Sequence, residues 1–186
     1  FGPQNAVGTF DKNKYPGGAR FSASEDSIDR ILDAYPKIGT AYLLLAESRI
    51  DVCAREYARA SAVNVTAMKS IIDALFARQI LPVFYSSDMV FDGRGGPYNE
   101  ESEAVPIVKY GQMKLEIENY LKEKKIPHLT IRLSKVISSE IGINSLLTEW
   151  RDAVRSNNLI LCAEDQAFCP IDLEDVVQGS LELVGQ

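Results

Sequence analysis

The sequence predicts an α/β fold built on a parallel sheet. Short apolar runs alternate with segments in which apolar residues recur every three or four positions, as in strand–helix–strand units. Hydrophobic residues make up 46% and charged residues 25% of the 186 residues, as in ordinary globular proteins. This length is enough for one domain with a sizeable core, so we expect residues 1–186 to form a single domain.

The first half of the chain contains five expected elements. They are short strands at Ala6–Phe10 and Ala19–Ala23, a helix at Ser27–Tyr35, a buried strand at Ala41–Ala46 and a long helix at Cys53–Arg78. Ser24 is a candidate N-cap for the first helix, because a serine hydroxyl can accept from a free backbone N–H. In the long helix, Val63, Ala67 and Ile71 fall on one stripe, which predicts a buried face.

The second half continues the same alternation. We expect strands at Leu81–Ser86, Leu129–Leu133 and Leu159–Cys162, a glycine-rich loop at Asp92–Pro97, and helices at Tyr110–Lys124, Ser145–Arg155 and Leu173–Val184. Strands that alternate with helices in this way favour parallel pairing within residues 6–162.

Composition argues against several classes of protein. The net charge of −6 disfavours a nucleic-acid binder. No apolar run approaches the roughly 20 residues of a membrane span, and no signal peptide is evident, so we expect a cytoplasmic protein. Cys53, Cys162 and Cys169 are scattered, and His128 is the one histidine, so we expect no metal site and only buried or surface thiols.

The segment Tyr110-Gly-Gln-Met-Lys114 places a phenol and an ammonium one helical turn apart, on one face. A neighbouring cation stabilises a phenolate, so we expect a lowered tyrosine pKa and proton transfer near neutral pH. The spacing alone is typical of exposed helical pairs, and Tyr120 and Lys124 repeat it.

The surroundings separate the two pairs. A buried strand before Tyr110 ends in Ser86-Ser87-Asp88, and ligands bind at the carboxyl ends of parallel strands. One loop and a helix start can bring Ser87 to Tyr110. Lys124 belongs to the charged run KEKK, so we interpret the Tyr120–Lys124 pair as solvated surface.

The stretch SSDMVFDGRGGPYNEESEAVPIVKYGQMKLEIE resembles the dTDP-4-dehydrorhamnose reductases of the extended short-chain dehydrogenase/reductase superfamily. It equally resembles their non-reducing relative, the regulatory beta subunit of methionine adenosyltransferase. The segments AESRIDVCAREYARASAVNV, IRLSKVI and EDQAFCPIDLEDVV extend the resemblance over about residues 5–184.

The resemblance implies roles for three residues. Tyr110 would protonate a carbonyl oxygen, Ser87 would hydrogen-bond the same oxygen, and Lys114 would bind the nicotinamide ribose and tune Tyr110. Implied cofactor-binding residues are Lys12, Leu45, Ala46, Ser86, Tyr110, Lys114 and Leu133. Implied substrate-binding residues are Ser87, Asp88, Val90, Phe91 and Asn144.

The cofactor would be NADP(H) or NAD(H). Lys12 and Lys14 could meet a 2′-phosphate and Asp11 a ribose hydroxyl, with a weak preference for NADP(H).

The resemblance also implies a Rossmann-like doubly wound parallel sheet. The glycine turn that holds a pyrophosphate in that fold is not found, so we expect the chain to lack the first strand, glycine turn and helix, and part of the C-terminal substrate region. In the strand order 3-2-1-4-5-6 the missing strand is central. The run Leu43-Leu44-Leu45-Ala46 is bulkier than the small residues the family commonly has there, and could crowd a dinucleotide.

Two functions follow as hypotheses. The first is an NAD(P)H-dependent reductase of a nucleotide-linked 4-keto-6-deoxy sugar, in surface polysaccharide or deoxysugar synthesis, with the nucleotide sugar as substrate. The second is a non-catalytic regulatory subunit of the same fold that binds a sugar nucleotide or a dinucleotide. A homodimer is a possible assembly in either case.

Overall fold

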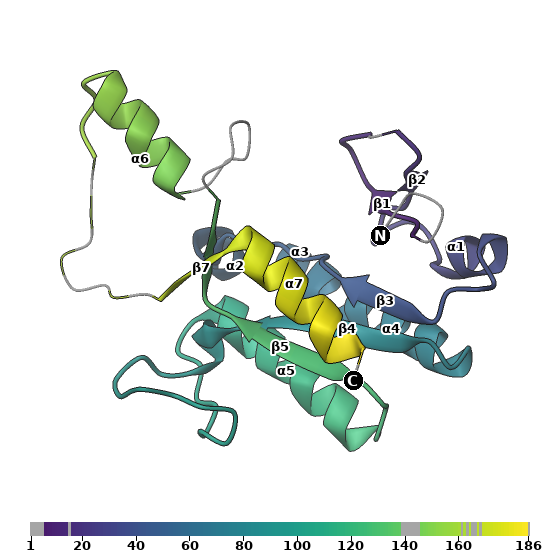
Figure 1. Cartoon of the computed structure of the whole chain (residues 1–186). Helices are drawn as coiled ribbons and strands as arrows, with labels where there is room; N and C mark the ends of the chain where they lie inside the picture. Colours follow the sequence, from purple (N-terminus) through teal and green to yellow (C-terminus); the bar gives the residue numbers. More distant parts are fainter. Residues whose placement is uncertain are drawn as a thin grey trace. The chain divides into compact units, whose positions relative to one another are not determined.

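The computed structural model describes residues 6–14, 16–138, 146–160, 162, 164, 167 and 169–185. The chain divides into two compact units, Phe1–Thr130 and Ile131–Gln186 (Figure 1). The expectation of a single domain stays a prediction.

Two parallel sheets organise the first unit. Strands β1 (Thr9–Phe10) and β2 (Ala19–Arg20) pair with each other. Strand β3 (Thr40–Leu43) pairs in parallel with β4 (Leu81–Ser87), in a sheet of order β3-β4-β5. The unit boundary falls within β5 (Leu129–Leu133). Among the described residues the two sheets are not joined. The break lies between β1 and β3, where the resemblance places the missing strand.

Helical segments connect these strands. They are α1 (Asp29–Ala34), α2 (Ile50–Arg55), α3 (Tyr57–Ser61), the π-helix η1 (Ala62–Ala67), α4 (Met68–Ala77), the 3₁₀ turn η2 (Asp88–Val90) and α5 (Lys109–Glu123). Helices α4 and α5 pack against β4 and against each other, so the end of β4 lies beside α5 (Figure 1).

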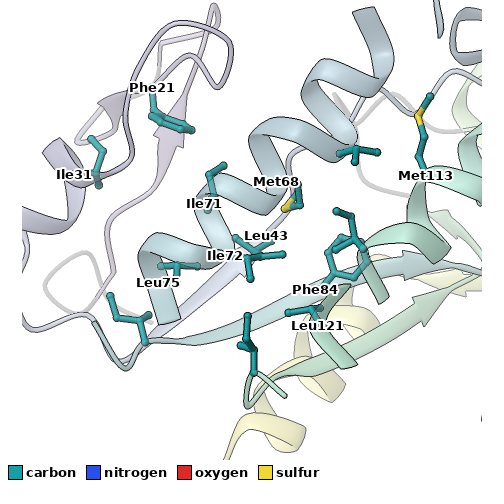
Figure 2. Packing of buried hydrophobic residues seen from close by; sticks show 14 of the residues in the cluster. Phe21, Ile31, Leu43, Met68, Ile71, Ile72, Leu75, Phe84, Met113 and Leu121 are labelled. Carbon is teal, nitrogen blue, oxygen red and sulfur yellow. The ribbon is translucent and has the colours of Figure 1, made fainter. Parts of the chain in front are cut away.

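The core of the first unit lies between α4 and the sheet. Met68, Ile72 and Leu75 of α4 are buried with Phe84 of β4 and Leu121 of α5 (Figure 2). Because apolar residues recur every three or four positions along α4, one face of the helix enters this core. The core fixes α5 on β4 and thereby positions the residues at the end of that strand.

The helical stretch Tyr57–Ala77 is long and apolar enough to cross a membrane, by length and composition only. The expectation that no apolar run approaches this length is wrong by this measure. The stretch includes Met68, Ile72 and Leu75, which are fully buried in the core. A core helix passes the same test of length and composition, so the match is weak evidence for a membrane.

The second unit is smaller. Strands β6 (Lys135–Ile137) and β7 (Pro170–Asp172) pair in parallel, and α7 (Leu173–Val184) packs on both. The Asp172 carboxylate caps α7 by accepting from the Glu174 N–H at 2.9 Å. Helix α6 (Leu146–Arg155) precedes β7 in the chain.

Three expectations need correction. Helix α1 begins at Asp29, whose N–H donates to Ser27 Oγ at 3.2 Å, so Ser24 is not its cap. Leu159, Ile160 and Cys162 belong to no strand, although the run is apolar, and Leu161 lies outside the described residues. Within the described ranges the strands form three separate parallel sheets and not one continuous sheet over residues 6–162. The break between β1 and β3 falls where the expected central strand is missing from the sequence.

Candidate active site at the end of strand β4

Ser87 is the last residue of β4 and caps the turn that follows. Its hydroxyl donates to Asp88 Oδ1 at 3.0 Å and accepts from the Met89 N–H at 3.2 Å. These bonds hold η2 tightly and place the Ser87 and Asp88 side chains together at the carboxyl end of the strand.

Helix α5 approaches this turn at Gly111. A Cβ at this position would lie 2.0 Å from the Met89 carbonyl oxygen, far inside contact distance, so only glycine allows the approach. The next residue toward the N-terminus is Tyr110, which is half-buried. The contact therefore sets Tyr110 beside the turn that carries Ser87 and Asp88.

Lys114 lies one turn further along α5 and is 5% exposed. Its Nζ donates to the Tyr85 backbone carbonyl at 2.7 Å and lies 4.8 Å from the centroid of the Phe84 ring and 5.5 Å from that of Tyr110. Burial lowers the pKa of Lys114 to about 8. The side chain therefore remains mainly an ammonium at neutral pH.

The electrostatics of Tyr110 differ from the expectation. Burial raises its pKa to about 12, and the charges of Cys53 and Asp88 add to the effect. The expected lowering by Lys114 is wrong for this state, because the ammonium is directed to the Tyr85 carbonyl and desolvation dominates. Tyr110 consequently keeps its proton at neutral pH and can act as a donor.

The second Tyr–Lys pair has a structural role. The Tyr120 hydroxyl donates to Asp73 Oδ1 at 2.6 Å, and Lys124 Nζ lies 3.8 Å from the same oxygen. Tyr120 is half-buried and links α5 to α4, so it is not simply the solvated surface expected from the sequence.

Asn64 is a buried residue with a structural role that the sequence did not point to. It lies in η1, is 5% exposed, accepts from the Glu47 N–H at 2.7 Å and donates to the Glu47 carbonyl at 2.9 Å. The Cys53 thiol donates to the same carbonyl at 3.2 Å. These three hydrogen bonds fix the backbone of Glu47 in the loop after β3. A buried amide within the apolar run AVNVTA was the available signal.

Ser86 faces helix α5. Its hydroxyl donates to Glu118 Oε1 at 2.6 Å, and both side chains are buried. The Ser86 side chain is therefore engaged inside the fold, and its assignment to a cofactor stays a prediction.

The other expected site residues lie in several places. Val90 is fully buried, and Phe91 stacks on Tyr98 with ring centroids 4.4 Å apart. Leu45 and Ala46 are half-buried after β3, and Lys12 is exposed after β1. Leu133 ends β5 in the second unit, and Asn144 lies outside the described residues. Ser87, Asp88, Tyr110 and Lys114 lie on β4, η2 and α5, and α5 contacts both of the other elements. Their roles as site residues stay predictions.

Most of the chain matches one protein family. Residues 25–186 match the RmlD substrate binding domain. The chain belongs to the RmlD substrate-binding domain family. The RmlD-like segment contains all of β3, β4 and α5, and so the whole Tyr110–Lys114 site.

Curated relatives of this RmlD-like chain include reductases. It is 28% identical over 163 residues to a probable low-salt glycan biosynthesis reductase of Haloferax volcanii, covering 86% of this chain and 54% of that protein. It is 33% identical over 147 residues to a dTDP-4-dehydrorhamnose reductase of Sinorhizobium fredii, covering 78% and 48%. A methionine adenosyltransferase 2 subunit beta of Xenopus laevis is 29% identical over 143 residues, covering 74% and 42%. The chain spans about half the length of these relatives.

Solved structures share the fold. A hypothetical dTDP-4-dehydrorhamnose reductase from Sulfolobus tokodaii superposes with a TM-score of 0.82 at 22% identity, covering 96% of this chain and 63% of that one. The Bacillus anthracis dTDP-4-dehydrorhamnose reductase in complex with NADP gives 0.78 at 19% identity, covering 86% and 56%. The fold is therefore α/β with parallel sheets of the Rossmann type.

Proposed function

We propose that this protein is an NAD(P)H-dependent reductase of a nucleotide-linked 4-keto-6-deoxy sugar, acting in the cytoplasm in surface polysaccharide or deoxysugar synthesis. The observation that carries the proposal is the Tyr110–Lys114 pair, held on one face of α5 beside the end of β4 that bears Ser87. Membership of the RmlD-like family supports the sugar-nucleotide substrate class.

Each side chain has a distinct task in this proposal. Tyr110 keeps its proton until the carbonyl oxygen gains negative charge and then donates it. The Ser87 hydroxyl exchanges its bond to Asp88 for one to the same oxygen. Both donors stabilise charge that develops only in the transition state, which is the charge that matters for rate.

The residues present fit the nicotinamide-ribose end of a dinucleotide. Among the described residues, the Lys114 ammonium donates only to the Tyr85 carbonyl, so two of its three N–H groups can bind ribose hydroxyls. The cofactor would supply the hydride. Lys12, exposed in the loop after β1, favours NADP(H) weakly over NAD(H). The alternative is a non-catalytic binding subunit. It is supported by the 29% sequence identity to a methionine adenosyltransferase 2 subunit beta and by the bulky leucines after β3.

The test is a reductase assay of the native protein with NADPH or NADH and a dTDP-4-keto-6-deoxy sugar. We expect reduced-cofactor consumption that depends on the sugar. Lys114→Ala should weaken cofactor binding and slow turnover together, because the ammonium serves both. Cofactor or sugar-nucleotide binding without any turnover would instead support the binding subunit.

A further inference from the structure

A buried carboxyl group lies one turn beyond Lys114. Glu118 is 1% exposed and accepts a 2.6 Å hydrogen bond from Ser86 Oγ, itself only 4% exposed. Its neighbours Ile117 and Leu121 are fully buried and apolar. Burial of a carboxyl group is costly, and a hydrophobic side chain of similar volume is often as stable at such a site. The polar pair therefore calls for a role besides stability.

The pair belongs to a series of contacts between α5 and the end of β4. Gly111 lies against the Met89 carbonyl, Lys114 donates to the Tyr85 carbonyl, and Glu118 holds the Ser86 hydroxyl. Ser86 directly follows Tyr85, so fixing the Ser86 side chain also fixes the carbonyl to which Lys114 donates. A helix that slid along β4 would break all three contacts together.

We propose that Glu118 is a positioning residue, which through its hydrogen bond to Ser86 fixes the end of β4 on α5 and so holds the Tyr85 carbonyl at the Lys114 ammonium. Its effect on turnover rests on the proposed function. Its effect on Lys114 does not, because that contact exists in the ligand-free chain.

The titration of Lys114 reports this contact without substrate or cofactor. The pKa of Lys114 is lowered to about 8 by burial, so a loosened interface that admits water should raise it towards 10.5. Because burial is the cause of the lowered pKa, a substitution of Glu118 that keeps the interface closed should leave the pKa of Lys114 near 8. The charges that act on neighbouring Tyr110 are those of Cys53 in α2 and Asp88 in η2, and none of the variants changes them.

The experiment measures the pH dependence of Lys114 acetylation by acetic anhydride in the native protein, read by mass spectrometry. In Ser86→Ala and Glu118→Leu we expect the pKa of Lys114 to rise from about 8 towards 10.5. In Glu118→Gln, which keeps an acceptor oxygen, it should stay near 8. Ser86→Ala is the smaller change and keeps the test decisive if Glu118→Leu does not fold.

Two controls separate positioning from general damage. Glu116 lies on the same helix as Glu118, and Glu116→Gln breaks its ion pair with Lys69 of α4. Leu121→Ala opens the core one turn beyond Glu118. Neither should move the pKa of Lys114. If the native protein reduces a keto sugar, kcat in Ser86→Ala and Glu118→Leu should fall by roughly 10-fold to 100-fold with little change in KM for the sugar. An unchanged or lowered pKa of Lys114 in both variants would overturn the proposal, whatever the activity.

Discussion

The Nζ atom of Lys114 lies 2.7 Å from the backbone carbonyl oxygen of Tyr85, one strand residue before the two serines. A buried ammonium is costly unless it is hydrogen-bonded, and here a strand carbonyl and two aromatic faces replace water. This contact keeps a mainly charged lysine under the candidate site at neutral pH.

Burial of Lys114 should be visible as a pH dependence of stability. Its pKa is about 8 in the folded chain and 10.5 when unperturbed, so between these values the unfolded chain binds more protons. The free energy of unfolding should therefore rise with pH, by about 2 kcal/mol between pH 8 and pH 10. Lys114→Met removes this contribution, and urea unfolding of both proteins across the range measures the difference.

Above pH 10 the titration of Tyr110 opposes that of Lys114. The pKa of Tyr110 is about 12 when folded and 10.0 when unperturbed, so above pH 10 the folded chain binds more protons and stability falls. Equal pH slopes for Lys114→Met and wild type below pH 10 would show that Lys114 is not desolvated as described.

Gly111→Ala should destabilise the protein. Its Cβ would meet the Met89 carbonyl oxygen at 2.0 Å, and the backbone has to move to relieve the clash. Overpacking typically costs about 1–3 kcal/mol, against roughly 1 kcal/mol gained by alanine over glycine in a helix, which leaves a net loss of about 0–2 kcal/mol. Because the clash is with backbone atoms, we expect the upper end of this range. Gly179→Ala is the matched control, because its Cβ would meet nothing within 4 Å in α7. It should stabilise by about 0.5–1 kcal/mol in denaturant unfolding. Similar shifts for both variants would refute the close approach.

Asn64→Ala should release the loop after β3. Both the N–H and the carbonyl of Glu47 lose a buried partner, which costs about 1–3 kcal/mol. Amide hydrogen exchange should show loss of protection at Glu47. Asn99→Ala, which removes an exposed asparagine from a surface loop, should stay within about 0.5 kcal/mol of wild type. Protection at Glu47 that survives Asn64→Ala would contradict this role of Asn64.

Much of the fold could be predicted because local patterns are strong. The strand Leu129–Leu133 and the helix Leu173–Val184 have the predicted bounds. Apolar and polar residues alternate along the strand, and the helix starts directly after its cap, Asp172, and ends before Gly185. The long helical region Cys53–Arg78 was predicted in part, because the structure ends α2 at Arg55, begins α3 at Tyr57 and contains the π-helix Ala62–Ala67. The apolar run 159–162 failed because hydrophobicity alone does not say whether a partner strand is present.

The candidate site was predictable only in part. The spacing of Tyr110 and Lys114 put them on one helical face, and the strand end placed Ser87 nearby. The partners of Asn64, Gly111 and Glu118 depend on how α5 and η1 pack against the strands. The position of each helix along its strand cannot be predicted from one sequence. The raised pKa of Tyr110 escaped notice for the same reason, because the direction of the Lys114 side chain is a tertiary property.

The measurement that tests the account most directly compares Tyr110→Phe with Tyr120→Phe in the native protein, by steady-state kinetics and cofactor titration. Tyr110→Phe should lower kcat by about 10²–10⁴-fold with cofactor affinity nearly intact, because the phenol acts as the proton donor in the transition state. Tyr120→Phe has the same spacing to a lysine and loses only its bond to Asp73, so turnover should match wild type with a small loss of stability. If both variants turn over the keto sugar at the wild-type rate, Tyr110 is not the proton donor and the reductase proposal fails.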